Sequence, residues 1–118
     1  MKPSLPELAY TDTAFHGAKV VVFQKGNLLV KLRDNKPNIY FPNQWDFPGG
    51  GRESDESPIE TAIRECGEEF SVTLQPGDII WGKKFPAAIL PNAFVWFFLA
   101  VVPDNRPLDV ALGDEGQE

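Results

Sequence analysis

Several glutamates are clustered in the middle of the chain, where residues 49–72 read GGGRESDESPIETAIRECGEEFSV. Glu65, Glu68 and Glu69 are three and four residues apart, so on a helix with about 100° per residue they share one arc. Like charges at these spacings repel by roughly a few tenths of a kcal/mol per pair. A cation would relieve this repulsion, and Mg²⁺ is commonly held by a few carboxylates together with substrate phosphates. The spacing therefore indicates a metal and phosphate site, although on its own such spacing is more often a solvated acidic face.

The element that must carry these glutamates is a helix that begins at Ser57. Ser57 is a favoured N-cap, Pro58 suits the first helical position, and Glu60 completes a capping box. We expect this helix to end near Glu69. Its apolar stripe, beside the glutamates, would consist of Ile59, Ala62, Ile63, Cys66 and Phe70.

The remaining pattern predicts strands around this helix. Residues 18–24 and 27–33 are apolar runs on either side of a tight turn that contains Gly and Asn, which is typical of a hairpin. Residues 79–84 are expected to form a further strand. The apolar run 94–102 is too short to span a bilayer and is expected to form a central strand that is buried on both faces.

The segments outside these elements are expected to be loops. Residues up to Phe15 show no clear periodicity, which predicts irregular structure or at most a short edge strand. Residues 34–47 combine turn-forming residues with aromatic ones, and these aromatic side chains could either seal the core or face a ligand. A turn is expected at residues 104–107.

Length and composition bound the class of protein. With 118 residues, 42% of them apolar and 24% charged, the chain is expected to form one domain over residues 1–118. A net charge of −6 disfavours binding of a polyanion, so any phosphate ligand would need metal ions. The single Cys66 cannot form an internal disulfide, and neither a membrane-length apolar run nor a secretory signal is present. We therefore expect a cytoplasmic protein that binds neither a membrane nor a nucleic-acid polymer.

The ordered spacing of charged residues extends beyond the helix. Gly50 is followed after five residues by Glu56, and after seven more come, in order, Arg64, Glu65, Cys66, Gly67, Glu68, Glu69, Phe70, Ser71 and Val72. This pattern resembles the Nudix box, and every charged position of that family signature is filled. The preceding residues 45–50 (WDFPGG) and the later residues 115–117 (EGQ) resemble elements of the MutT branch of the family. The resemblance thus extends from the first predicted hairpin almost to the end of the chain.

One position departs from the family pattern. Ser71 stands where the family usually has glycine just past the helix, a place that favours a left-handed backbone. Serine in that conformation costs on the order of 1 kcal/mol but removes no carboxylate. We expect the departure to affect loop geometry rather than chemistry, and activity to survive.

The resemblance implies an α+β fold in which a mixed β-sheet lies between helices. It also implies attack of water on a nucleoside diphosphate linked to another group, with Mg²⁺ as cofactor and Mn²⁺ as a substitute. By position, the implied metal ligands are Glu65, Glu68, Glu69, the backbone carbonyl of Gly49 and, in an outer role, Glu115. The implied catalytic residues are Arg64, which would fix a carboxylate, and Glu65 as general base, with Glu68 or Glu115 as alternatives. Glu56 is expected to brace the loop rather than to touch metal.

The implied substrate is a small nucleotide. Arg33 matches a substrate-contacting arginine of the MutT branch, and Trp45, Asp46 and Phe97 are expected to lie around the base. These features favour a (d)NTP or an oxidised (d)NTP, with ADP-ribose or another dinucleotide or nucleotide sugar as the alternative. A further alternative is a Nudix module that binds a nucleotide without cleaving it. Its usual mark would be loss of a box carboxylate, and none is lost here.

The end of the sequence raises a further expectation. MutT-like proteins usually continue past Glu-Gly-Gln into another strand and a C-terminal helix, whereas this sequence ends at Glu118. We expect the fold to lack that helix and the base preference to be loose. An exposed sheet flank near residues 94–102 would then favour a homodimer.

Overall fold

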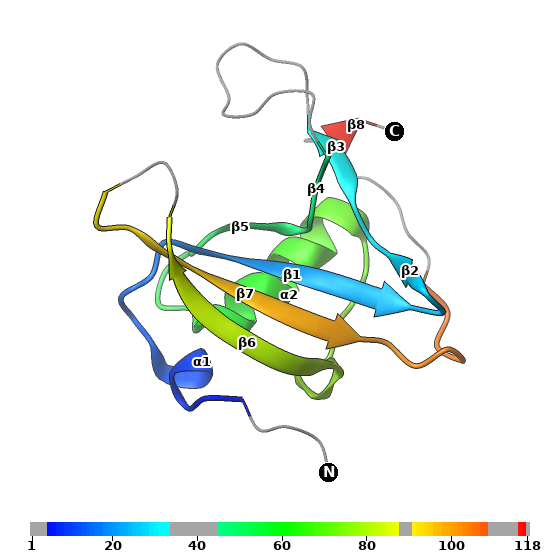
Figure 1. The fold of residues 1–118 in the computed structure, drawn as a ribbon, viewed down its shortest axis with the longest axis horizontal. Coiled ribbons are helices and arrows are strands. Elements are labelled where there is room, and N and C mark those ends of the chain that lie inside the picture. Colours follow the sequence, from blue (N-terminus) through cyan, green and yellow to red (C-terminus); the bar gives the residue numbers. More distant parts are fainter. Residues whose placement is uncertain (1–4, 34–44, 88–90, 109–115, 118) are drawn as a thin grey trace.

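The computed structural model describes residues 5–33, 45–87, 91–108 and 116–117 (Figure 1). Its elements are, in order, α1 (Leu8–Thr11), β1 (Gly17–Gln24), β2 (Asn27–Leu28), β3 (Lys31–Arg33), β4 (Trp45–Asp46), β5 (Gly49–Gly51), α2 (Pro58–Phe70), the 3₁₀ turn η1 (Pro76–Asp78), β6 (Ile79–Pro86), β7 (Phe94–Val101) and β8 (Gly116–Gln117). The α+β class predicted from the sequence is confirmed.

The larger sheet is mixed, as expected. Its strands lie in the order β2–β1–β7–β6, and β5 pairs with the other half of β1. β1 and β7 are parallel, with Gly17 opposite Val95, whereas the other pairs are antiparallel. β7 therefore lies between β1 and β6 and is central, as predicted. The strand predicted over 79–84 forms as β6, which extends two residues further, to Pro86. A smaller sheet has the order β4–β3–β8.

The predicted hairpin forms, but its second strand is shorter than expected. Lys25 and Gly26 both have positive φ, 53° and 79°, as in a two-residue type I′ turn. β2 then ends, and β3 pairs in the smaller sheet, so the prediction of one strand over 27–33 is wrong. At the break, Leu29 packs against the hydrophobic core, a contact that the alternation of apolar residues does not reveal.

The N-terminal segment contains a short helix that the sequence did not predict. α1 packs against α2, and its Ala9 is fully buried. The expectation of irregular structure or an edge strand up to Phe15 is therefore wrong here. A single helical turn is not stable alone, so this tertiary contact, rather than a local pattern, stabilises it.

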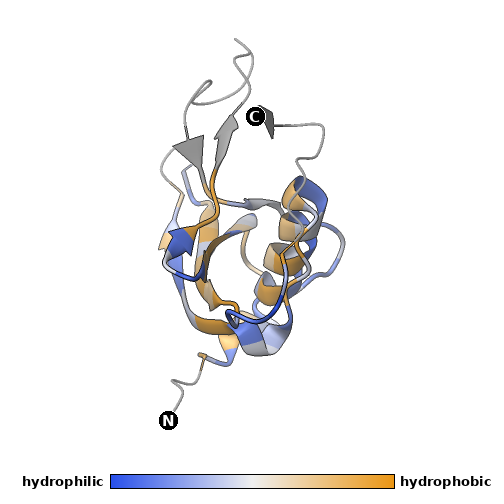
Figure 2. Cartoon of the chain, turned by 90° about the vertical axis from the view of Figure 1, so that its right-hand side faces the viewer, coloured by the Kyte–Doolittle hydropathy of each residue, from blue (hydrophilic) through white to orange (hydrophobic). Residues whose placement is uncertain are grey.

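α2 begins where predicted and ends one residue later. Ser57 Oγ accepts a hydrogen bond from the Glu60 N–H at 3.2 Å, and Glu60 Oε1 accepts one from the Ser57 N–H at 2.8 Å. At the other end, Ser71 is left-handed with a φ of 59°, as expected for a position usually held by glycine. In Figure 2 the apolar side of α2 faces the sheet, and its buried residues there include Ile59, Ala62, Cys66 and Phe70.

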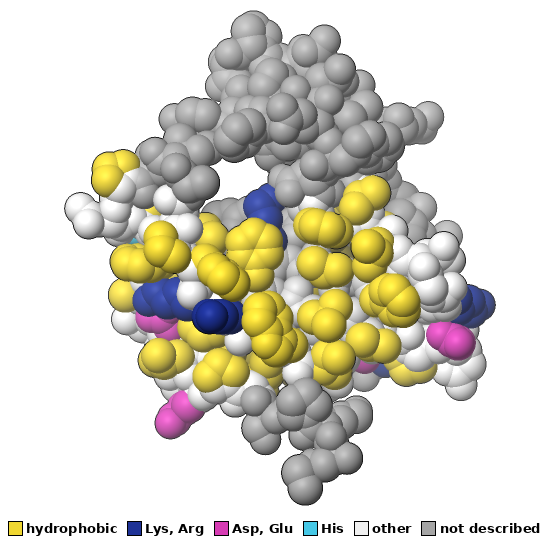
Figure 3. Space-filling view, viewed as in Figure 1, with side chains coloured by type: hydrophobic (Ala, Val, Ile, Leu, Met, Phe, Trp, Pro, Cys, Tyr) yellow, Lys and Arg dark blue, Asp and Glu magenta, His cyan; other side chains and the backbone are white. Residues whose placement is uncertain are grey.

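The face of the sheet opposite α2 carries many apolar side chains (Figure 3). Along β7, alternate residues point to the two faces. Trp96, Phe98 and Ala100 are buried toward α2, and Val95, Phe97 and Leu99 are half-buried on the other face. The prediction that this strand is buried on both faces is therefore wrong for one of them.

No α-helix within the described ranges is long and apolar enough to cross a membrane.

Candidate active site

The site is built on β5, a strand of three glycines at the edge of the sheet. The N–H of Val20 on β1 donates to the Pro48 carbonyl at 2.9 Å. In the alternation of an antiparallel pair, the next residue, Gly49, therefore directs its own N–H and carbonyl away from β1. The Gly49 N–H donates to Glu69 Oε1 of α2 at 3.0 Å. The Gly49 carbonyl thus faces the same edge as a carboxylate of α2.

Gly50 leaves the room that Glu65 needs. A Cβ at residue 50 would overlap the Glu65 carboxylate, whose side chain is only 13% exposed. Burial raises the pKa of Glu65; the Arg64 guanidinium opposes this shift, and the charges of Glu69 and Glu68 add to it. Glu65 is therefore a desolvated carboxylate whose charged form a nearby cation would stabilise.

Arg64 connects the carboxylates to the loop that precedes α2. Its Nη1 donates to Glu65 at 2.7 Å and to Glu68 at 3.1 Å. Its Nε donates to Glu56 at 2.7 Å, and its Nη2 donates to Glu56 at 3.1 Å and to the Gly51 carbonyl at 2.7 Å. The bond with Glu56 is the main cause that raises the pKa of Arg64 and lowers the pKa of Glu56. One charged guanidinium thus orients three glutamates.

Glu56 braces the loop, as predicted from the sequence. Besides its bonds with Arg64, its carboxylate accepts from the Glu53 N–H at 2.9 Å and from Thr61 Oγ1 at 3.1 Å. It therefore links the loop, the first turns of α2 and the guanidinium.

The three predicted metal ligands on α2, Glu65, Glu68 and Glu69, differ in their surroundings. Glu69 is 6% exposed and accepts from β5, and Glu65 lies against the same strand. The Glu68 side chain is 57% exposed and lies on the solvent side of Arg64. Glu65 and Glu69 are thus the inner pair, with Glu68 at the outer edge of the site.

The donor atoms that converge on β5 are all oxygens. The carboxylates of Glu65 and Glu69 and the carbonyl of Gly49 suit a hard divalent cation such as Mg²⁺ or Mn²⁺. Within the described ranges, no three acidic, histidine or cysteine side chains are grouped so that they could hold an ion by themselves. A cation here would therefore also use a backbone carbonyl, water and phosphate oxygens, which is the usual mode for Mg²⁺.

Other predicted site residues either lie outside the described residues or have only their backbone described. Glu115 is outside the described residues, and so are the aromatic residues of 34–44. Arg33 pairs with Gly116 in β8, and Trp45 and Asp46 pair with β3, but only their backbone is described. The backbone pairing places Arg33, the predicted substrate-contacting arginine, opposite Gly116.

Phe97 lies in a hollow on the face of the sheet opposite α2. This hollow has a volume of about 400 Å³ and is lined by Trp81, Phe85 and Phe97. The rings of Phe85 and Phe97 are edge to face, with centroids 5.6 Å apart. Lys19 of β1 lies opposite both Phe97 and Gly49. The backbone of Phe97, at one side of the hollow, is therefore two strand spacings, roughly 10 Å, from Gly49.

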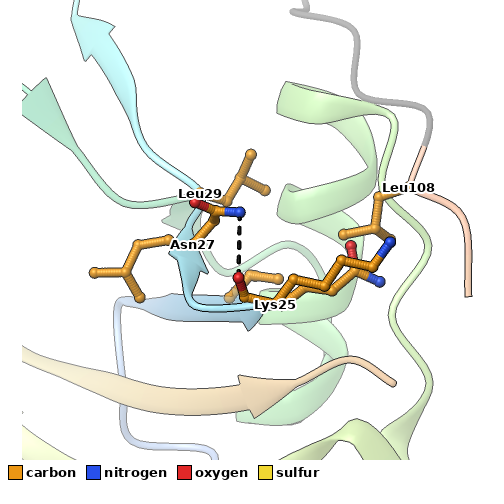
Figure 4. A pocket seen from close by; sticks show the side chains of 7 residues that line it. Lys25, Asn27, Leu29 and Leu108 are labelled. Carbon is orange, nitrogen blue, oxygen red and sulfur yellow. Dashed lines mark hydrogen bonds between the residues drawn. The ribbon is translucent and has the colours of Figure 1, made fainter. Parts of the chain in front are cut away.

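A second hollow, of about 220 Å³, lies near the β1–β2 turn (Figure 4). Lys25, Asn27, Leu29 and Leu108 are among its lining residues, and Asn27 Nδ2 donates to the Lys25 carbonyl at 3.5 Å. β5 pairs with residues 17–19, at the opposite end of β1. This hollow is therefore not part of the carboxylate site.

Sequence reasoning missed two residues that support the site. Arg52 Nε donates to the Glu56 carbonyl at 2.8 Å, and Thr61 donates to the Glu56 carboxylate. The place of Arg52 directly after three glycines was a weak signal, because charged loop residues are mostly solvated. Thr61 gave no signal, because its place in the predicted helix does not distinguish it from residues that only pack there.

A family model for the NUDIX domain matches residues 15–117, which is most of the chain. This chain belongs to the Nudix family. It is 29% identical over 89 residues to the m7GpppN-mRNA hydrolase NUDT17 of Danio rerio, a match that covers 70% of this chain and 30% of that protein. The chain thus spans less than a third of the length of this Nudix relative.

Solved structures show the same Nudix fold. The MutT protein of Methanosarcina mazei Go1 is 26% identical, with a TM-score of 0.65 over 91% of this chain and 75% of that one. An Ap4A hydrolase of C. elegans is 25% identical, with a TM-score of 0.64 over 86% of this chain and 75% of that one. A bifunctional NMN adenylyltransferase/ADP-ribose pyrophosphatase of Francisella tularensis, solved with AMP and a Mn ion, is 20% identical, with a TM-score of 0.72 over 100% of this chain and 33% of that one. Three of these proteins are named for different substrates, m7GpppN-mRNA, Ap4A and ADP-ribose, so the family alone does not select one.

Proposed function

We propose that this chain is a divalent-cation-dependent pyrophosphohydrolase that cleaves a nucleoside diphosphate linked to another group, with a (d)NTP or an oxidised (d)NTP as its substrate. The observation that carries this proposal is the convergence of the Glu65 and Glu69 carboxylates on the glycine strand β5, beside the Gly49 carbonyl. Arg64 holds Glu65 and Glu68 in the same place. An acidic helix face that was merely solvated would not need this support.

The proposed roles follow from these positions. Glu65, Glu69, Glu68 and the Gly49 carbonyl would hold Mg²⁺, or Mn²⁺ in its place, with Glu115 as an outer ligand. When bound, the cation would neutralise the pyrophosphate oxygens and lower the pKa of water. Arg64 keeps the carboxylates oriented. Glu65 is the proposed general base, with Glu68 and Glu115 as alternatives.

The base is proposed to stack in the hollow formed by Trp81, Phe85 and Phe97. This hollow is apolar, and Lys19 lies between it and Gly49 in the register of the sheet. One nucleotide could thus place its phosphate chain at the β5 edge and its base on the aromatic rings. Arg33, Trp45 and Asp46 are proposed to contact the phosphate and the base.

The proposal of a (d)NTP substrate is supported by the likeness to a MutT protein, of which this chain covers 75%. The alternative is a dinucleotide such as ADP-ribose or a dinucleoside polyphosphate, which the likeness to an Ap4A hydrolase favours. A panel of common and oxidised (d)NTPs, ADP-ribose, Ap4A and capped RNA, assayed with Mg²⁺, tests these choices. A preference for a (d)NTP supports the proposal, and a preference for any other member replaces the substrate assignment.

The other alternative is a Nudix module that binds nucleotides without cleaving them. The same panel separates this function from an enzyme, because a binding module would gain thermal stability from a nucleotide without forming product. All the box carboxylates are present, which favours the enzyme.

Two finer expectations stay predictions. A cytoplasmic location is one. The other is a homodimer, which would form through the apolar end of the sheet where Phe23, Leu28 and Val101 are 37%, 51% and 40% exposed and pair in register. Light scattering tests the dimer, and a monomeric mass would exclude it.

A further inference from the structure

Arg52, directly after β5, joins the N-terminal segment to the loop that precedes α2. Its backbone N–H donates to the His16 carbonyl at 2.9 Å. Its guanidinium donates from Nη1 to the Thr13 carbonyl at 3.1 Å and from Nε to the Glu56 carbonyl at 2.8 Å. The guanidinium also lies over the Phe15 ring, with Cζ 5.0 Å from the ring centroid. A single side chain thus bridges the loop and a segment 39 residues earlier in the chain.

The segment that Arg52 contacts is itself fixed in the core. Asp12 is 7% exposed and accepts from Trp96 Nε1 at 2.9 Å and from the Ala14 N–H at 2.9 Å. Lys84 of β6 lies 3.0 Å from the same carboxylate. Phe15, under the guanidinium, is 5% exposed. Arg52 therefore holds the loop against a rigid support rather than against a free terminus.

Glu56 is held from both ends by two different arginines. Arg52 bonds to its backbone carbonyl, and Arg64 bonds to its carboxylate at 2.7 and 3.1 Å. Arg64 then reaches Glu65 and Glu68. The contacts form one continuous path from the N-terminal segment to the proposed metal ligands.

We propose that Arg52 is a positioning residue of the active site, and that segment 12–16 is part of the scaffold of that site. Arg52 fixes the backbone at Glu56, which places the Glu56 carboxylate where Arg64 can hold Glu65 and Glu68. Among the described contacts, Arg52 reaches no proposed metal ligand directly, so it acts through Glu56 and Arg64. Supporting contacts of this kind typically change metal affinity or activity about 10- to 100-fold when they are removed. The proposal rests on the function proposed above.

The test compares Arg52→Gln with Arg106→Gln. Arg106 is a matched control because it also makes a two-bond interaction, with Asp78 at the end of η1, outside the path to the carboxylates. We expect Arg52→Gln to lower kcat about 10- to 100-fold with little change in KM, and to weaken Mn²⁺ binding, measured by electron paramagnetic resonance, by about tenfold or more. Backbone amides of residues 53–57 should exchange hydrogen faster in Arg52→Gln and at the wild-type rate in Arg106→Gln.

A second variant, Arg52→Lys, keeps the test decisive if Arg52→Gln does not fold. Lysine retains the charge over Phe15 but cannot bond to Thr13 and Glu56 in the same fork geometry. We expect intermediate kcat, intermediate Mn²⁺ affinity and intermediate exchange in residues 53–57, at a melting temperature close to that of the wild type.

The outcomes separate this proposal from the proposed function. Wild-type kcat, Mn²⁺ affinity and loop exchange in the folded Arg52 variant would overturn the proposal. An equal loss of kcat in Arg106→Gln would also overturn it, because the effect would then reflect general stability. If the wild-type protein hydrolyses no nucleotide, the proposed function fails, and the Mn²⁺ affinity and the loop exchange still decide the role of Arg52.

Discussion

Glu65 lies against Gly50 so closely that any side chain at residue 50 would displace its carboxylate. Gly50→Ala is therefore expected to move Glu65 away from the Gly49 carbonyl. The clash is with the far end of a flexible side chain, so the loss of stability should be small. Activity should fall about 10- to 100-fold, the range typical for disturbed support of a metal site. Steady-state kinetics together with urea unfolding measure both effects.

The matched control is Gly67→Ala on α2. A Cβ there would meet no atom closer than 3.9 Å. This variant should keep wild-type activity and gain up to about 1 kcal/mol of stability from its better helix propensity. Equal activity in the Gly50 and Gly67 variants would show that Glu65 does not need its observed position.

Glu65, Glu68 and Glu69 should be more important for turnover than Glu60, the fourth glutamate of α2. Glu65→Gln, Glu68→Gln and Glu69→Gln are each expected to lower turnover by at least about a hundredfold, the scale of lost electrostatic or acid–base assistance. Glu60→Gln is the control, because glutamine also completes a capping box. Unchanged turnover in a Glu68 variant would remove this exposed residue from the site.

The aromatic hollow should contribute affinity for any base. Phe97→Ala is expected to raise KM for all nucleotides by about 5- to 150-fold, the equivalent of roughly 1 to 3 kcal/mol of stacking. The ratio of KM values between bases should change little, since stacking does not select one base. An unchanged KM would place the base elsewhere.

Ser71 offers a test of the left-handed helix end. Its φ of 59° is unfavourable for serine and readily adopted by glycine. Ser71→Gly is expected to raise the free energy of unfolding by about 1 kcal/mol without loss of activity. A destabilised variant in urea unfolding would show that the serine makes a compensating contact.

Asp12 should make stability depend on acid pH. Burial alone would raise the pKa of Asp12, but the hydrogen bonds from Trp96, Ala14 and Lys84 together outweigh it and lower the pKa. The ionised carboxylate then stabilises the fold at pH values above the unfolded pKa, about 3.9, and this contribution is lost as pH falls through the lower folded pKa. Asp12→Asn should therefore lower the free energy of unfolding by about 1 to 2 kcal/mol at pH 7.

The difference between the wild type and Asp12→Asn should shrink when urea unfolding is repeated below about pH 4. Asp104→Asn, at an exposed position, is the control for removing a carboxylate. Parallel curves for the wild type and Asp12→Asn over this pH range would contradict the assignment.

The parts of the fold and site that depend on nearby residues could be predicted from the sequence. The capping box of Ser57 and Glu60 and the arc of Glu65, Glu68 and Glu69 are set by spacings of three and four residues. Such spacings translate directly into helix geometry. The left-handed Ser71 was also expected, because the family pattern places glycine there.

The parts that depend on distant residues could not be predicted in the same way. Trp96 bonds to Asp12 across 84 positions, and Arg52 bonds to Thr13 across 39. Neither pair leaves a periodic trace in the sequence. The helix α1 and the break at Leu29 were missed for the same reason, since packing against the core rather than local propensity decides both.

The products formed from a (d)NTP in the presence of Mg²⁺ test the proposed function most directly. Wild-type protein and Glu65→Gln are incubated with each substrate, with Mg²⁺ or with excess EDTA, and the products are separated by chromatography. Cleavage of the pyrophosphate next to the nucleoside should give nucleoside monophosphate and pyrophosphate with the wild type and Mg²⁺, and at least about a hundredfold less with Glu65→Gln or EDTA. Monophosphate formed equally in EDTA, or no product from any substrate while nucleotides still raise the melting temperature, would contradict the proposed function.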